Sequence, residues 1–225
     1  MNEPAEIARV YIINRDSNAR DAHRGLLESL GYRTETFADA ASFLARANLE
    51  AAGCVVLDVA LPDQQDGEPQ AQLQAVSSPL ALVFLTLDDD IDTAVAAMRR
   101  EAAGYLLKPV REQQLLDVVN GALRQSLAAA LRNRARRGVL AHLARLTPRE
   151  HDILNQLAEG AHYDVVSRRL GISKRTVEAH RRRIMEKMGA RTLPQLLRQL
   201  AQVGWPGSSA LRSPPGGPGS RPGAD

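Results

Sequence analysis

The chain has 225 residues, of which 44% are hydrophobic and 24% are charged, a composition typical of globular proteins rather than of disordered ones. No stretch approaches the roughly 18 apolar residues that a membrane span needs, and the N-terminus lacks a basic segment followed by an apolar one. A single cysteine, Cys54, excludes an internal disulfide framework and a multi-cysteine zinc site. We therefore expect a soluble, cytoplasmic protein.

The net charge of +3 conceals an asymmetry along the chain. Residues 1–125 carry 11 Lys and Arg against 19 Asp and Glu, a net charge of −8. Residues 126–225 carry 18 against 7, a net charge of +11. This asymmetry predicts two domains with different partners, and it makes the basic half a candidate for nucleic-acid binding. On charge alone, a solvated basic surface is the alternative.

Short apolar runs alternate with helical periodicity over residues 9–125. Residues 10–13, 54–58, 80–86 and 104–107 are predicted to be buried strands, and residues 33–37 a weaker fifth strand. Residues 22–30 and 91–98 have helical spacing. Continuously apolar strands that alternate with helices predict a five-stranded parallel sheet covered on both faces. Cys54 begins one of these strands, which favours a core residue over a redox sensor.

Ligands of such sheets gather beyond the carboxyl ends of the strands. In this sequence the positions that follow the predicted strands are polar: Asn14, Arg15, Asp16, Asp58, Thr86 and Lys108. We expect these side chains to line one site at one edge of the sheet.

The remaining chain divides by composition. Residues 126–145 are rich in Ala and Arg and are predicted to form a linker, helical on either side of Gly138. From Pro206 onward the last 20 residues include five Pro and five Gly, too few apolar groups to offset the entropy of ordering. We therefore expect domains at residues 8–125 and 146–204, with a disordered tail over residues 205–225.

Helix signals are strong in the second domain. Thr147 is placed to cap a helix that begins at Pro148, and Glu150 is placed to complete a capping box. A second helix over residues 162–170 should end at Gly171, and Ser173 should cap a third helix over residues 174–188. Two short helices joined by a tight turn form the helix-turn-helix arrangement, whose second helix enters the major groove.

Helical periodicity separates two faces of the third helix. Ile184 and Met188 lie within about 20° of Val177, and these three predict a buried stripe. The opposite face, predicted to meet bases, carries Arg175, Glu178, Ala179, Arg182 and Glu186. The flanking positions predicted to meet phosphates are Thr176, His180, Arg181, Arg183 and Lys187, and Lys174 is a further candidate for DNA binding. An ordinary exposed charged helix is the alternative. The other four histidines, His23, His142, His151 and His162, show no metal-ligand spacing.

The second domain resembles the LuxR-type DNA-binding domain over its whole length: LTPREHDILNQLAEG…RRLGISKRTVEAHRRRIMEKMGARTLPQLLRQL. The resemblance implies that Glu178, Ala179 and Arg182 face bases. It also implies that the final helix, over residues 193–203, supplies a dimer contact through Leu193, Leu196, Leu197 and Leu200. Tyr163, Asp164 and Val165 stand where the family usually has Asn-Lys-Glu, and we expect Asp164 to repel phosphate.

Residues 8–125 resemble the receiver domain of two-component response regulators, and the combination with the second domain resembles the FixJ-like branch. The resemblance implies a doubly wound, flavodoxin-like fold and a sensor histidine kinase as partner. Asp58 corresponds to the phosphoacceptor, and Thr86, Tyr105 and Lys108 correspond to the switch residues. In this chemistry a carboxylate oxygen attacks phosphorus while Lys and Mg²⁺ neutralise the phosphoryl oxygens.

The sequence departs from the receiver pattern at the acidic pair that helps to hold Mg²⁺. Asn14 and Arg15 stand there, and an amide with a guanidinium is a poor environment for that cation. Asp16 should point elsewhere by strand alternation. Arg15 is expected within reach of Asp58, with Lys108 approaching from the other side. We therefore predict an atypical receiver without a metal cofactor.

Three aspartates, Asp88, Asp89 and Asp90, follow the strand that ends at Thr86. They are interpreted as solvated charges at a helix N-terminus, with improvised metal ligands as the alternative.

The leading hypothesis is a transcriptional regulator, not an enzyme, that binds double-stranded DNA as a homodimer. Three alternatives stay open at this point. The first is conventional control by phosphorylation of Asp58. The second is a phosphoryl-transfer enzyme that uses Asp58, Lys108 and the aspartate triplet, and the third is a pure protein-interaction module.

Overall fold

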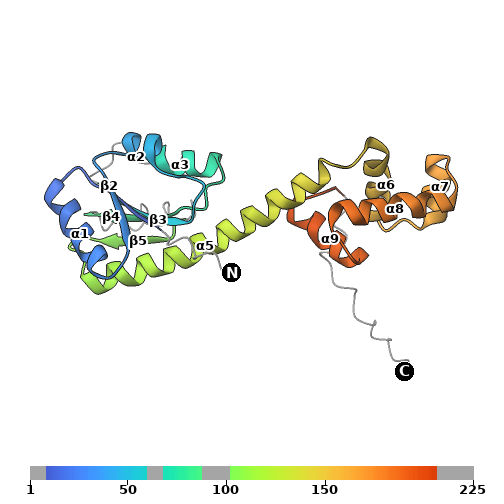
Figure 1. The fold of residues 1–225 in the computed structure, drawn as a ribbon. Helices are drawn as coiled ribbons and strands as arrows, with labels where there is room; N and C mark the ends of the chain where they lie inside the picture. The colour runs from blue at the N-terminus through green and yellow to red at the C-terminus, as the bar shows by residue number, and fades with distance from the viewer. Residues whose placement is uncertain (1–8, 60–67, 88–101, 207–225) are drawn as a thin grey trace, which may run out of the picture. The chain divides into compact units, whose positions relative to one another are not determined.

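A computed structural model describes residues 9–59, 68–87 and 102–206 (Figure 1). The chain forms two compact units that divide between Asn133 and Arg134, here called the front unit and the back unit. Among the described residues, no helix has both the length and the apolar character required to cross a membrane. The predicted helix over residues 91–98 and the aspartates at 88–90 lie outside the described residues.

The front unit is built on a five-stranded parallel sheet of order β2-β1-β3-β4-β5. The strands are β1 (Arg9–Ile13), β2 (Arg33–Phe37), β3 (Gly53–Val59), β4 (Ala81–Thr86) and β5 (Gly104–Leu107). All five predicted strands are confirmed. Because the connections reverse direction at β1, the carboxyl ends of β1 and β3 flank the switch point at which such sheets bind ligands.

Helices cover both faces of this sheet (Figure 1). One face packs against α1 (Ser17–Ser29) and α5 (Glu112–Leu143), which contribute Leu27 and Leu115 to a core with Val10 and Cys54. The other face packs against α2 (Ala40–Arg46) and α3 (Glu68–Ala75). Cys54 is fully buried, as predicted, and burial raises the pKa of its thiol to about 12. The thiol is therefore protonated and unreactive at neutral pH.

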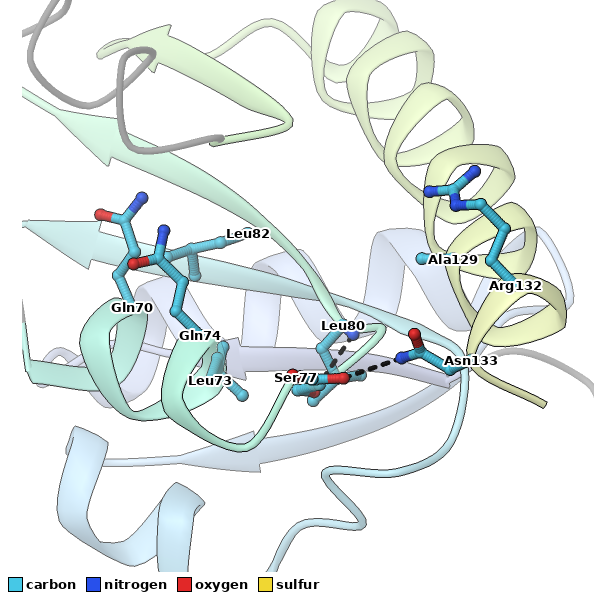
Figure 2. Close-up of a pocket in the computed structure, with 10 residues that line it drawn as sticks. Gln70, Leu73, Gln74, Ser77, Leu80, Leu82, Ala129, Arg132 and Asn133 are labelled. Atoms are coloured by element: carbon cyan, nitrogen blue, oxygen red, sulfur yellow. Dashed lines mark hydrogen bonds between the residues drawn. The ribbon is translucent and has the colours of Figure 1, made fainter. Parts of the chain in front are cut away.

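The helix α5 is continuous through Gly138, where two helical pieces were predicted. Its middle part is attached to the front unit, because the Ser126 hydroxyl oxygen accepts from the Gly53 N–H at 2.8 Å. About two turns further on, the Asn133 side-chain amide donates to the Ser77 carbonyl oxygen at 2.8 Å, beside a cavity of about 550 Å³ between α3 and α5 (Figure 2).

The last turns of α5 belong to the back unit, because Val139 and Leu143 pack into its core. The predicted linker over residues 126–145 is therefore shared between the two units. It is not a separate segment.

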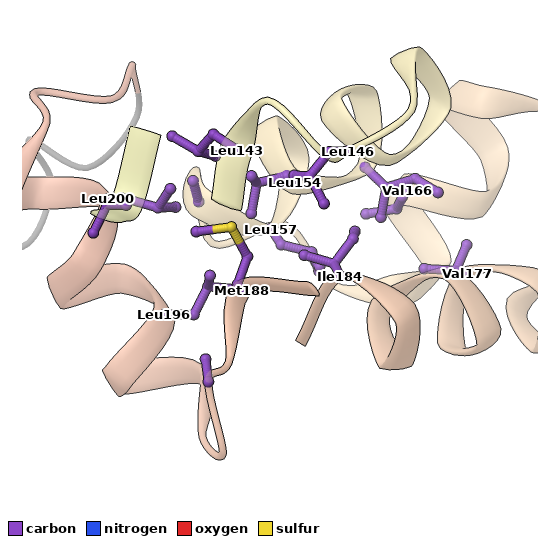
Figure 3. Close-up of a cluster of buried hydrophobic side chains, with 14 residues drawn as sticks. Leu143, Leu146, Leu154, Leu157, Val166, Val177, Ile184, Met188, Leu196 and Leu200 are labelled. Atoms are coloured by element: carbon purple, nitrogen blue, oxygen red, sulfur yellow. The ribbon is translucent and has the colours of Figure 1, made fainter. Parts of the chain in front are cut away.

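The back unit contains α6 (Pro148–Ala158), α7 (Tyr163–Leu170), α8 (Lys174–Met188) and α9 (Leu193–Gln202). The predicted caps are confirmed: Thr147 and Glu150 form a capping box, and the Ser173 hydroxyl oxygen accepts from the Thr176 N–H. Gly171 ends α7 in the left-handed region, at φ 64°, which lets the chain turn into α8. Leucines and other apolar side chains of all these helices meet in one core (Figure 3).

The folded part of the back unit extends one residue further than predicted. Trp205 was assigned to the tail, but its indole N–H donates to the Asn155 side-chain oxygen at 2.9 Å. Its ring stacks on His151 with the ring centroids 5.5 Å apart.

Candidate functional site

Asn14, Asp58 and Lys108 meet at the carboxyl edge of the sheet. The Asn14 amide nitrogen donates to Asp58 Oδ2 at 2.6 Å, and Lys108 Nζ donates to Asp58 Oδ1 at 2.5 Å. The Asp58 side chain is only 6% exposed. Both oxygens of a buried carboxylate therefore already accept from N–H donors, one of them a cation.

Arg15 does not supply the second cation that the sequence led us to expect. Its side chain is exposed, and among the described residues no hydrogen bond or ion pair joins it to Asp58. The pKa of Asp39 is lowered mainly by hydrogen bonds from Ser42, with a smaller contribution from the Arg15 charge. The prediction failed because neighbouring positions after a strand point in different directions, and Asn14 takes the inward one.

Asp16 acts as the N-cap of α1. Its carboxylate accepts from the Asn18 N–H at 2.9 Å, while its own backbone N–H donates to Asn14 Oδ1 at 2.8 Å. The second contact fixes the orientation of the Asn14 amide, so that its nitrogen rather than its oxygen faces Asp58.

These residues do not fit Mg²⁺, which needs several oxygen ligands in near-octahedral geometry. The Asn14 amide oxygen accepts from backbone, the Asp16 carboxylate caps a helix, and a lysine ammonium contacts Asp58. Within the described parts of the chain, no three His, Cys, Asp or Glu side chains are grouped so that they could hold a metal ion.

His23 belongs to the same site, although its position in the sequence did not indicate this. It lines a cavity of about 610 Å³ together with Asp58, Lys108 and Arg15. Burial lowers the pKa of His23, the Asp58 charge opposes this and the Lys108 charge adds to it, so the ring is neutral at neutral pH. The signal that could have placed it is its spacing of four residues from the buried Leu27, which puts both on one face of α1.

The switch positions lie near this site. Thr86 ends β4 and is 5% exposed, and its carbonyl oxygen accepts from the Lys108 N–H at 2.8 Å. The sheet register pairs Asp58 with Leu85 and Val59 with Thr86, so Asp58 and Thr86 end neighbouring strands. Tyr105 lies in β5, packed against the second face of the sheet.

The candidate nucleic-acid interface is the outer face of α8. Val177, Ile184 and Met188 are fully buried, as the periodicity predicts. The exposed residues of α8 are those of the opposite face together with Lys174 and Arg183: Lys174, Arg175, Glu178, Ala179, Arg182, Arg183 and Glu186. The face that was predicted to meet bases is therefore exposed.

Two lysines predicted to bind DNA, Lys174 and Lys187, contact carboxylates in this structure. Lys187 Nζ donates to Glu150 Oε2 at 2.6 Å, and the Glu150 side chain is only 3% exposed. Lys174, the first residue of α8, forms an ion pair with Asp164 of α7. The other flanking side chains, Thr176, His180 and Arg181, are partly buried.

The leucines of α9 do not all face outward. Leu196 and Leu200 are 1% and 0% exposed and lie in the core of the back unit (Figure 3). They therefore cannot provide the exposed dimer contact that was expected of them. Leu193 and Leu197 are partly buried against the same core.

Comparisons with known proteins identify both units. Residues 10–120 match the family described as "Response regulator receiver domain", and residues 144–200 match "Bacterial regulatory proteins, luxR family". The chain is 36% identical over 200 residues to the tetrathionate response regulatory protein TtrR of Salmonella typhimurium, a match that covers 89% of this chain and 95% of that protein.

A second relative and a solved structure have the same similarity to this chain over most of its length. The transcriptional regulatory protein FixJ of Bradyrhizobium diazoefficiens is 33% identical over 195 residues, which cover 87% of this chain and 95% of that protein. The solved structure of the response regulator StyR has a TM-score of 0.71 at 33% identity, covering 87% of this chain and 98% of that one.

The chain thus belongs to the two-component response regulators. More narrowly, it is a transcriptional regulator that joins a receiver domain to a LuxR-type DNA-binding domain, homologous to FixJ and TtrR. The family is one of transcriptional regulators rather than of enzymes. Its second domain implies DNA binding, and its receiver implies a kinase partner.

Proposed function

We propose that this regulator controls DNA binding through an atypical receiver that works without Mg²⁺ and without phosphorylation of Asp58. The observation that carries the proposal is the pairing of both Asp58 oxygens, one with the Asn14 amide and one with the Lys108 ammonium. Each oxygen that would bind a metal ion or attack phosphorus therefore already accepts a hydrogen bond.

Electrostatics support the same conclusion. The charged residues that line the cavity are Arg15, Asp16, Asp58 and Lys108, and their formal charges sum to zero. A divalent cation therefore meets no net negative potential there, and it would have to displace an ammonium from a buried carboxylate. Mg²⁺ also loses its bound water reluctantly, and the described residues of this site provide too few anionic oxygens to replace that water.

We infer further that the protein binds double-stranded DNA as a homodimer in the cytoplasm. The outer face of α8 is presented for the major groove, and a two-fold pair of such helices reads two half-sites. The dimer contact would use surfaces other than Leu196 and Leu200, since both are buried within one unit.

Conventional phosphorylation by a sensor histidine kinase is the second candidate. It is favoured by the placement of Asp58, Thr86 and Lys108 at one edge of the sheet. The nucleophile, the hydroxyl and the cation of that chemistry thus lie at one edge of the sheet, while Asn14 and Arg15 stand in place of the acidic pair that helps to hold Mg²⁺.

A metal titration combined with chemical phosphorylation separates the two candidates. The full chain is titrated with Mg²⁺ by calorimetry and then incubated with acetyl phosphate and Mg²⁺, and the mass of the intact protein is measured. We expect no metal binding at millimolar concentration and no acyl phosphate. The variant carrying Asn14→Asp and Arg15→Asp should gain metal binding. Stoichiometric phosphorylation of Asp58 in the unaltered chain would overturn the proposal.

A further inference from the structure

An ion pair joins the first turns of the two helices of the helix-turn-helix. Lys174 is the first residue of α8, and its ammonium contacts the Asp164 carboxylate in the first turn of α7. The two side chains are 65% and 58% exposed, so the pair lies on the surface of the back unit. It is a contact between two side chains whose charges are both accessible to a DNA backbone.

The surroundings keep Asp164 ionised. The hydrogen bond from Lys174 is the main reason that the pKa of Asp164 is lowered, burial opposes it, and the charges of Lys174 and Arg168 add to the lowering. The N-cap of α7, His162, makes no side-chain capping hydrogen bond, so Asp164 is the acidic group at this positive helix end. A groove of about 510 Å³ lined by His162, Asp164 and Lys174 runs beside the pair.

We propose that Asp164 is an internal competitor of the DNA phosphates for Lys174, and thereby lowers both the affinity and the salt dependence of DNA binding. The carboxylate occupies the position at the ammonium that a phosphate oxygen would take. The inference rests on the function described above, DNA binding through α8.

Counterion release gives this competition a measurable signature. A lysine that neutralises one phosphate steepens the log–log salt dependence of binding by about 0.9. When Lys174 leaves Asp164 for a phosphate, however, the carboxylate is left to recruit a cation from solution. The two effects cancel, and the pair contributes almost nothing to the salt slope.

A structural role for the ion pair predicts a different outcome. Exposed ion pairs contribute little to stability because water and salt screen both charges. If Asp164 served only to hold α7 against α8, its replacement by Asn would lower the unfolding temperature and leave the salt slope unchanged. The two roles therefore separate in a single set of measurements.

The experiment measures binding of the full chain to a fluorescently labelled duplex of random sequence by anisotropy, at several salt concentrations. The variants are Asp164→Asn, Lys174→Met and the two together. Glu159→Gln is the matched control, because Glu159 is an equally exposed carboxylate of the same unit that faces Arg169 instead of α8. Thermal unfolding is recorded for every variant.

We expect Asp164→Asn to raise the affinity about three- to tenfold at about 0.1 M salt and to steepen the slope by about one unit. In the Lys174→Met background the same change should raise the affinity less than about twofold, because that chain has no Lys174 ammonium for a phosphate to gain. The control should change neither quantity, and unfolding temperatures should shift by no more than about 2 °C.

An equal gain in both backgrounds would overturn the inference, because Asp164 would then act as a diffuse repulsive charge. A null effect of Asp164→Asn in a protein that binds the duplex would also overturn it. If the unaltered chain does not bind the duplex with salt-dependent affinity, the failure belongs to DNA binding itself. Weaker binding on Arg183→Ala, at an exposed position predicted to meet phosphates, confirms that α8 is the surface being measured.

Discussion

Lys187 Nζ lies 2.6 Å from Oε2 of the buried Glu150 and so ties the end of α8 to the start of α6. The same carboxylate accepts from the Thr147 N–H at 2.8 Å as part of the capping box. One side chain thus serves a helix cap and an ion pair between helices. Lys187 is therefore a structural residue of the back unit, although its position on α8 first suggested a phosphate contact.

Lys187→Met should destabilise the back unit by about 1–3 kcal/mol, because it leaves the buried Glu150 carboxylate without its cation. Arg183→Met is the matched control, since it removes one positive charge from an exposed position of the same helix and should cost less than about 0.5 kcal/mol. Urea unfolding followed by fluorescence measures both, because the only tryptophan, Trp205, lies in this unit. Equal unfolding free energies for the two variants would contradict the structural role.

The ion pair also predicts how stability depends on pH. Burial alone would raise the pKa of Glu150, but hydrogen bonds from Lys187 and Thr147 outweigh it and hold the pKa below its ordinary value. A carboxyl group with a lowered folded-state pKa contributes stability above its unfolded pKa and loses that contribution as the pH falls through the folded value.

The back unit should therefore lose stability as the pH falls below about 4, and Lys187→Met should flatten this part of the profile. Both expectations are tested by measuring the midpoint of urea unfolding of each chain between about pH 3 and pH 7. A decline that is as steep in the variant as in the unaltered chain would show that other carboxylates control acid unfolding.

Arg182 and Arg183 should distinguish base contacts from phosphate contacts. Arg182 lies on the exposed face opposite the buried stripe, so Arg182→Ala should cost about 1–3 kcal/mol on a cognate duplex and much less on a scrambled one. Arg183→Ala should weaken binding to both duplexes similarly and reduce the salt slope by roughly one unit. Equal losses on both duplexes for Arg182→Ala would place the wrong face of α8 in the groove.

Periodicity and capping rules were sufficient to predict the five strands and the helices α6, α7 and α8, whereas α2 and α3 were not predicted. The capping box at Thr147 and the buried stripe through Val177 both depend on residues within one or two helical turns, so their spacing can be read directly from the sequence. The parallel sheet followed in the same way, because its strands are continuously apolar.

The contacts between distant side chains could not be predicted in this way. Asn14 reaches Asp58 across 44 positions, and Lys187 reaches Glu150 across 37. A sequence pattern shows that Arg15 and Asn14 are adjacent but not which of them turns inward. Likewise, Leu196 and Leu200 form one stripe that suits a dimer surface and a core equally well, and only the packing of α9 decides between them.

The position of Trp205 leads to a last prediction, about where the chain can be shortened. Truncation after Gly204 removes the indole that donates to Asn155 and stacks on His151, so the back unit should lose about 1–2 kcal/mol of stability. Truncation after Pro206 keeps these contacts and should change neither stability nor DNA binding. Far-ultraviolet circular dichroism during thermal unfolding compares the two, since one of them lacks the tryptophan. If both shortened chains unfold at the temperature of the full chain, the Trp205 contacts contribute nothing, and the folded unit ends at Gly204.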